Sequence, residues 1–183
     1  MGQIERTIEV YERLRKYRYK ITIENGMEII MSFSPEHYHH LVGYHYLTDV
    51  KSVSDPYLSK HRFYRSMKNG AVSVEQILNS VHYMQISERI DYFHYLEEIV
   101  SEGEGRIIVD FDKQKADSTI DAKFFLFKRD GEVLTGESVT YYSLFIGYDQ
   151  KKEVYFPATY IIEHSIKYVS NQKMWDCKIE WID

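Results

Sequence analysis

The sequence predicts an α+β fold, with an N-terminal helix and β-hairpin, a helical middle and a C-terminal antiparallel sheet of four to five strands. Two observations support this class. First, apolar residues recur at helical spacing through most of the first hundred residues, with one hairpin signal among them. Second, strand-like segments joined by short polar connections follow Gly105. We expect a single domain over residues 1–183, with helix plus hairpin in 1–33, the helical part in 34–103 and the sheet in 104–183.

The first segment predicts a helix followed by two paired strands. Ile4, Ile8 and Tyr11 fall on one stripe of a helix over residues 4–16. Residues 17–24 alternate between faces, and Asn25-Gly26 favours the tight turn of a β-hairpin. We therefore expect the chain to return as a second strand over residues 27–33.

A histidine-rich segment follows the hairpin. Residues 34–46 contain half of the chain's eight histidines, namely His37, His39, His40 and His45. Ser34 and Pro35 are typical of the start of a helix, and Gly43 is typical of its end. On a 3.6-residue period, one face of this helix carries His37, His40, Leu41 and Tyr44, while His39 points elsewhere. Because imidazole titrates near neutral pH, an acid–base site is one interpretation of this face.

Three further helices are expected before the sheet. The first begins at Asp55-Pro56 and ends at Asn69-Gly70. The second covers residues 73–79, where Ser73 and Gln76 form a capping box. The third covers residues 87–100, which carry an apolar stripe. Five strands then follow, over residues 106–112, 122–128, 140–148, 154–163 and 174–181. Pro157 has no backbone N–H to donate, so its strand is expected to lie at an edge or to carry a bulge.

Composition narrows the class of protein. The net charge of −5 argues against a general nucleic-acid-binding protein. One segment is nevertheless basic: residues 51–68 carry Lys51, Lys60, Arg62, Arg65 and Lys68 against Asp55 alone. The single cysteine, Cys177, excludes an intrachain disulfide and a cysteine-rich zinc site and fits a reducing compartment. With no apolar run long enough to cross a bilayer and no apolar signal core, a cytoplasmic protein without a membrane partner is predicted.

Three motifs resemble those of one nuclease family. Residues 33–43 read FSPEHYHHLVG, Arg62-Phe63-Tyr64 falls on the next long helix, and Ser143-Leu144 falls on a late strand. From about residue 32 onward, the chain resembles the phage-associated branch of the barnase–EndoU–colicin E5/D–RelE-like (BECR-fold) nucleases. The resemblance implies helices followed by a four-stranded antiparallel sheet, and metal-independent RNA cleavage of toxin or phage-conflict type. It carries over to His40, Leu41, Gly43, Tyr64 and Ser143, whereas the N-terminal hairpin is additional.

Cleavage of this kind uses the RNA 2′-hydroxyl as nucleophile, so it needs acid–base groups and a cation or donors at the phosphate. We assign the acid–base role to His40, with Lys60 and Arg65 holding the phosphate and Ser143 donating to it. The residues expected to bind substrate are Tyr44, His61, Arg62, Tyr64 and Tyr141. The implied partners are RNA and an inhibitor or antitoxin protein, with no cofactor and no metal.

Other interpretations stay open. A non-catalytic module on the same fold would use the tyrosine-rich sheet to hold a protein or a nucleic acid. In a metal-site alternative, zinc or another transition ion is bound by histidines drawn from His37, His39, His40, His45 and His61. Asp110 and Asp112 fall on one face of their expected strand and are candidates for a carboxylate pair. Phosphate-binding P-loops, dinucleotide fingerprints and the Gly-x-Ser-x-Gly elbow are absent from the sequence.

Overall fold

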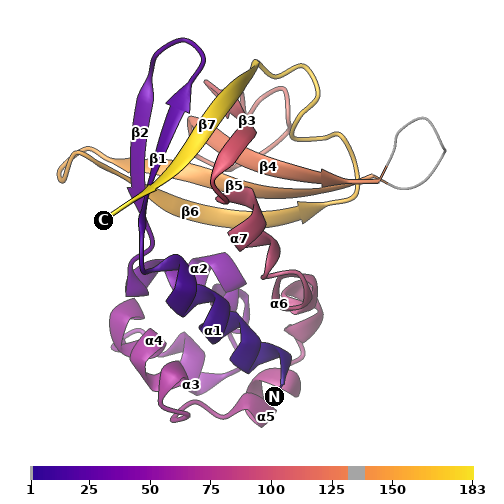
Figure 1. Ribbon diagram of the computed structural model, residues 1–183. Helices are drawn as coiled ribbons and strands as arrows, with labels where there is room; N and C mark the ends of the chain where they lie inside the picture. The colour runs from indigo at the N-terminus through magenta and orange to yellow at the C-terminus, as the bar shows by residue number, and fades with distance from the viewer. Residues whose placement is uncertain (1, 132–138) are drawn as a thin grey trace. The chain divides into compact units, whose positions relative to one another are not determined.

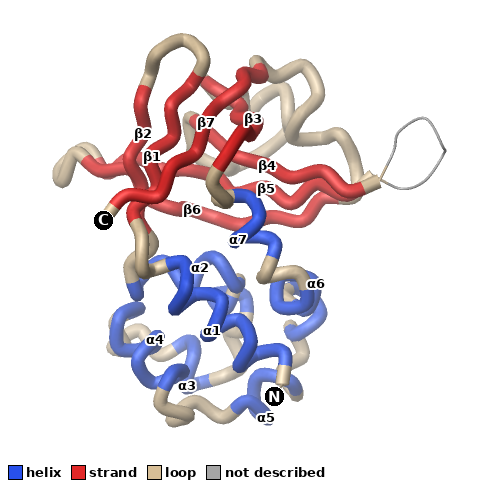
Figure 2. Tube along the Cα trace, in the orientation of Figure 1, coloured by secondary structure: helices blue, strands red, loops and turns tan. Residues whose placement is uncertain are grey.

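The computed structural model describes residues 2–131 and 139–183, and the chain divides into two compact units (Figures 1 and 2). The helical unit comprises Met1–Lys16 and Phe33–His94, and the barrel unit comprises Tyr17–Ser32 and Tyr95–Asp183. The α+β class, with its N-terminal helix and hairpin, is confirmed. The single domain expected from the sequence stays a prediction.

The helical unit is built from short helices. They are α1 (Gln3–Leu14), η1 (Pro35–His37), α2 (Tyr38–Val42), η2 (Tyr44–Tyr46), α3 (Lys51–Ser54), α4 (Lys60–Lys68), α5 (Val74–Leu78), η3 (Tyr83–Gln85) and α6 (Ser87–Asp91), where η marks a 3-10 helix. None of the helices in the described part of the chain is both long and apolar enough to cross a membrane.

Aromatic rings form the centre of the helical unit. Tyr11 on α1 and Tyr38 on α2 are fully buried with ring centroids 5.0 Å apart. Their polar ends are satisfied, because the Tyr38 hydroxyl lies 2.6 Å from Thr7 Oγ1 and the Tyr11 hydroxyl donates to the Ser34 carbonyl at 2.7 Å. Phe93 packs against both rings. These tyrosines therefore hold α2, and the histidines on it, against α1.

A carboxylate on α1 binds two groups of α4. Glu12 accepts hydrogen bonds from the Tyr64 hydroxyl and from Lys68 Nζ, the latter at 2.6 Å. Burial opposes ionisation of Glu12, but the hydrogen bonds from Lys68 and Tyr64 outweigh it and lower the pKa of Glu12 to about 2. Since α4 carries Lys60, this contact helps to place the basic helix.

Two expected helices differ from the structure. The helix expected from Asp55 begins only after Ser59. Asp55 Oδ1 accepts the Tyr57 N–H at 2.8 Å, which holds this segment in a turn. Ser59 then acts as the N-cap, because its Oγ accepts the Arg62 N–H at 3.3 Å. The helix expected over residues 87–100 is divided into α6 and α7 (Tyr95–Ile99), and the buried Phe93 lies in the turn between them.

The barrel unit corrects the expected sheet. Seven strands of the described chain close into a barrel in the order β1-β2-β6-β5-β4-β3-β7, rather than four or five forming an open sheet. They are β1 (Arg18–Ile23), β2 (Glu28–Ser32), β3 (Gly103–Val109), β4 (Phe124–Asp130), β5 (Thr140–Asp149), β6 (Val154–Glu163) and β7 (Met174–Ile182). The two extra strands are those of the N-terminal hairpin, which was expected to be a separate addition.

Closure depends on both strands of the hairpin. β1 pairs antiparallel with β7 from Arg18↔Ile182 to Ile23↔Cys177, and β2 makes a parallel contact with β6 at Met31↔Tyr155. The other neighbouring strands pair antiparallel. By joining β7 to β6, the hairpin removes two free edges that an open sheet would expose.

Two residues shape the β5–β6 pair. The register between these strands shifts between Phe145 and Ile146, opposite Pro157, which confirms the expected bulge. At Gly147, a Cβ atom would lie 2.6 Å from the Phe156 ring, so the missing side chain lets that ring lie against the backbone.

The candidate carboxylate pair on β3 does not form as expected. β3 ends at Val109, and Asp110 takes a left-handed backbone with φ 54°. Asp112 Oδ1 instead accepts backbone N–H groups of Gln114 and Lys115 at 3.1 and 3.3 Å. The two carboxylates therefore do not share a strand face.

Glu12 gives a test of how the helical unit is held together. Replacing Glu12 by Gln removes the charge that Lys68 and Tyr64 bind, so the free energy of unfolding should fall by about 1–2 kcal/mol at pH 7. Because the pKa is lowered in the folded state, this stabilisation is present above the ordinary carboxyl pKa and is lost as the pH falls toward 2.

Urea unfolding of the unsubstituted protein, Glu12→Gln and Glu9→Gln between pH 7 and 2.5 measures the effect. Glu9 is exposed on the same helix and serves as the matched control. Equal stability of the two variants at pH 7 would contradict the assignment.

Candidate active site

The candidate site lies in the helical unit, where α2 follows the turn at Ser34. The Ser34 N–H donates to His37 Nδ1 at 3.1 Å, so this ring caps the start of the helical segment. His39 and His40 follow within α2 and His45 lies on η2. The sequence placed His37 with His40 on one face, whereas the structure uses His37 to start the segment.

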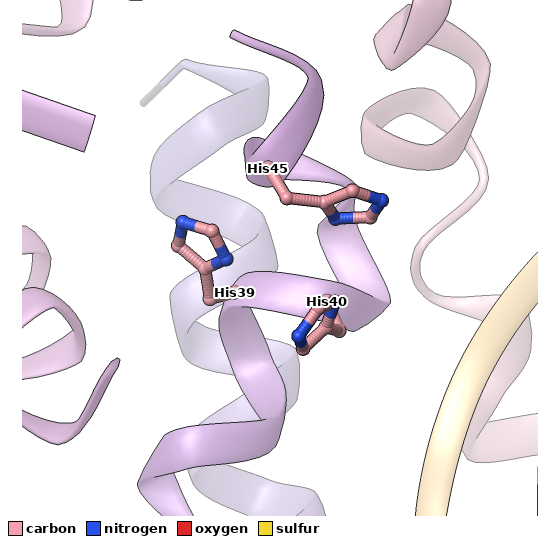
Figure 3. Close-up of side chains that lie close together, drawn as sticks. All are labelled: His39, His40 and His45. Carbon is pink, nitrogen blue, oxygen red and sulfur yellow. The ribbon is translucent and has the colours of Figure 1, made fainter. Parts of the chain in front are cut away.

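Gly43 brings the other histidines together. Its backbone is left-handed, with φ 92° and ψ 15°, and ends α2 by donating its N–H to the His40 carbonyl at 3.1 Å. The chain then reverses, so that the His45 ring lies 4.8 Å from that of His40 and 6.3 Å from that of His39, centroid to centroid (Figure 3). The sequence expected His39 to point away from the face that carries His40, but the two rings lie 5.8 Å apart, centroid to centroid, and His45 then joins both.

Lys60 from α4 meets His40. The Lys60 Nζ atom lies against His40 Nε2 within hydrogen-bonding distance, and the lone pair of a neutral imidazole is the natural acceptor for the ammonium group. Ser59 fixes this lysine at the first position of α4 by capping the helix. Two of the residues predicted to act in catalysis are thus in direct contact.

The electrostatics of the site keep its histidines neutral. Burial lowers the pKa of His40, and the positive charges of Lys60 and Arg89 lower it further. Burial and the neighbouring His40 likewise lower the pKa of His39 and His45 to about 4. At pH 7 the cluster therefore offers neutral imidazoles beside cationic groups.

Arg89 is a site residue that the sequence did not reveal. It lies on α6, its Nη1 is 3.5 Å from the His40 carbonyl, and its guanidinium lies 5.4 Å from the centre of the Tyr46 ring. The nearest charged residues in the sequence, Glu88 and Asp91, are acidic, and Arg89 is almost fifty residues from His40, so no local motif points to it.

The other predicted residues of the helical unit fall into two groups. His61, Arg62 and Arg65 are exposed on α4, the helix that carries Lys60. Tyr44 and Tyr64 are buried, with Tyr44 packed on Tyr38 and Phe63 and the Tyr64 hydroxyl bound to Glu12. These two tyrosines build the core, so their rings are not available to stack on a nucleotide.

Ser143 and Tyr141 belong to the barrel unit. Ser143 on β5 is fully buried, and its Oγ has no hydrogen-bond partner among the described residues. Because no part of its side chain reaches the surface, it is not suited to donate to a substrate phosphate. Tyr141 helps to line a pocket of ≈ 510 Å³, together with Glu104, Gly105, Arg106, Phe127, Arg129, Met174 and Asp176.

A family model described as phage-Barnase-EndoU-ColicinE5/D-RelE like nuclease 4 matches residues 3–177. The match covers nearly the whole chain, and the chain therefore belongs to this family. The resemblance proposed from the motifs around His40, Tyr64 and Ser143 is confirmed. The match also includes the N-terminal helix and hairpin, which the motifs alone did not reach. Comparison with curated proteins and with solved structures gave no match.

Gly43 gives a test of how the histidines are gathered. An alanine there would hold its Cβ 3.0 Å from Ile86 Cγ2 and 3.2 Å from Arg89 Nη1, in addition to the strain of its positive φ. Gly43→Ala should lower the free energy of unfolding by about 2–4 kcal/mol, the sum of backbone strain and crowding.

Gly70→Ala is the matched control, because Gly70 also has a positive φ, 68°, but a Cβ atom added there would meet nothing within 4 Å. Only the strain of about 1–2 kcal/mol should apply there. Chemical unfolding of both variants measures the difference, and an equal loss in the two would argue against the crowding at Gly43.

Proposed function

We propose that this member of the phage-Barnase-EndoU-ColicinE5/D-RelE like nuclease family is a metal-independent endoribonuclease of toxin or phage-conflict type. The observation that carries the proposal is the contact between Lys60 Nζ and His40 Nε2. It places a neutral base beside a cation, which is the pair of groups that cleavage by a 2′-hydroxyl requires.

His40 acts as the base in this proposal. The 2′-oxygen attacks the adjacent phosphorus as His40 Nε2 takes the hydroxyl proton, and the bond from phosphorus to the 5′-oxygen breaks. The products are a 2′,3′-cyclic phosphate and a 5′-hydroxyl, whose oxygen takes its proton from solvent. The lowered pKa of His40 supports this role because it keeps the lone pair free at neutral pH.

Lys60 and Arg65 act on the phosphate. An incoming phosphate draws the Lys60 ammonium away from His40, which frees the Nε2 lone pair and neutralises the negative charge that develops during attack. Arg65 lies exposed on the same helix and is proposed to contact the RNA backbone, with Arg62 and His61 beside it. The antitoxin or inhibitor expected for a protein of this type would cover the same surface.

The test is cleavage of total RNA by the pure protein in excess chelator, with analysis of the product ends. His40→Gln should lower the rate by about 10²–10⁴-fold, as expected for loss of a general base. Lys60→Met should lower it by about 10²–10³-fold through lost charge stabilisation. Products should carry 2′,3′-cyclic phosphate ends, and DNA should stay intact.

The matched controls are His82→Gln and Lys51→Met, which change the same residue types elsewhere in the helical unit. Both should cleave as the unsubstituted protein does. Cleavage that needs added divalent metal, or that is equally fast in His40→Gln, would contradict the proposal.

A second candidate function is supported by the pocket of the barrel unit. Arg106 and Arg129 line it beside the largely buried Tyr141, and two guanidinium groups in one pocket are suited to holding the backbone of a single-stranded nucleic acid without cleaving it. Acidic groups lie there too, since Asp176 is 3.8 Å from Arg106. This favours a ligand with a base edge as well as a phosphate over a simple anion.

Binding to this pocket can be measured separately from cleavage. In the His40→Gln background, Arg129→Ala should weaken the binding of a fluorescent single-stranded RNA, measured by anisotropy, because a cation that faces the backbone is lost. Lys151→Ala, an exposed cation of the same unit outside the pocket, should bind as its parent does. Equal affinity of the two variants would remove the pocket from the binding surface.

A further inference from the structure

Three histidines gather their ring nitrogens at one point of the helical unit. One nitrogen each from His39, His40 and His45 lies within 4.8 Å of the other two, and all three residues come from the seven positions around Gly43 (Figure 3). They are the one such group of potential metal ligands among the described residues. His37 and His61, which the sequence also offered as ligands, are not part of it.

His39 is arranged as a ligand would be. Its Nδ1 is buried and has no hydrogen-bond partner among the residues that the structure describes, while the ring also bonds to the Val53 backbone. A backbone partner on one nitrogen leaves the lone pair on the other, which is how metal-binding histidines are usually oriented. A buried nitrogen without a partner is unfavourable, and a metal ion would satisfy it.

We infer that His39, His40 and His45 bind a divalent transition-metal ion, such as Zn²⁺, Co²⁺ or Ni²⁺, and leave its remaining coordination to solvent or an anion. Three imidazoles without a carboxylate select these ions over Mg²⁺ and Ca²⁺, which prefer oxygen ligands.

Two cations limit the affinity of this site. Lys60 Nζ lies against His40 Nε2, and Arg89 adds positive charge beside the cluster. Either the ion displaces Lys60 or its charge is balanced by an anion in the open position. Removing the lysine charge should therefore strengthen metal binding, whereas removing a histidine should weaken it.

Metal binding has a consequence that rests on the proposed function. An ion on His40 occupies the imidazole that the cleavage reaction needs as a base. Bound metal should therefore inhibit the ribonuclease, and chelator should restore it. Direct binding measurements do not depend on this step, so failure of the nuclease proposal and failure of the metal proposal are distinguishable.

Calorimetric titration with Zn²⁺ and the visible absorption of Co²⁺ test the site in the whole chain. We expect one ion per chain and a Co²⁺ spectrum with imidazole coordination. His45→Ala and His39→Ala should each weaken binding at least about 100-fold. His61→Ala should bind as the unsubstituted protein does, and Lys60→Met should bind more tightly.

His45 is more exposed than His39, so His45→Ala tests the site even if His39→Ala fails to fold. Metal-free samples of each variant are first compared by circular dichroism. Two results would overturn the inference: no binding by the folded, unsubstituted protein, or the same affinity in His45→Ala as in His61→Ala.

Discussion

The left-handed turn at Gly43 is the constraint on which the candidate site depends. It ends α2 after one and a half turns and sends the chain back, which brings His45 beside His40 and His39. A side chain at this position would press on Ile86 and Arg89, the residues of the helical unit that close over the turn. The left-handed backbone at Gly43 thus fixes how the three histidines are arranged, and its lack of a side chain lets Arg89 lie close to them. The buried tyrosines of α1 and α2 hold this turn in place.

The site combines neutral imidazoles with permanent cations, and the two activities proposed for it, RNA cleavage and metal binding, compete. Lys60 and Arg89 attract an anion, whereas the lone pairs of the three histidines attract a transition metal. Both proposed uses involve His40, since the cleavage reaction needs its free lone pair and a bound metal ion would occupy its ring. The chain belongs to a family described as like nucleases, and phosphate is the anion that a nucleic-acid substrate would bring.

The sequence predicts features that depend on neighbouring residues and misses those that depend on distant ones. Asn25-Gly26, Gly43, Ser73 and Pro157 each give a local signal, and the turn, the helix end, the helix start and the bulge appear where they were expected. Closure of the barrel could not be predicted, because nothing near β1 records that β7 is its partner. In the site, His40 and Lys60 were expected to act together, but the position of His45 beside His39 and His40 depends on the chain reversal at Gly43. The burial of Ser143 and Tyr44 likewise follows from packing that no spacing rule describes.

The two strands of the hairpin precede most of the helical unit in the chain, whereas the other strands of the barrel follow it, and this order affects folding during synthesis. β7, the strand that pairs with β1, is synthesised about 150 residues after the hairpin, a delay on the order of ten seconds at ordinary rates of translation. Until then the hairpin exposes strand edges that invite wrong pairing, and a chaperone that shields it would favour correct closure. A chain whose translation stops before residue 174 lacks β7, the strand that joins β3 to β1, and so cannot close this barrel.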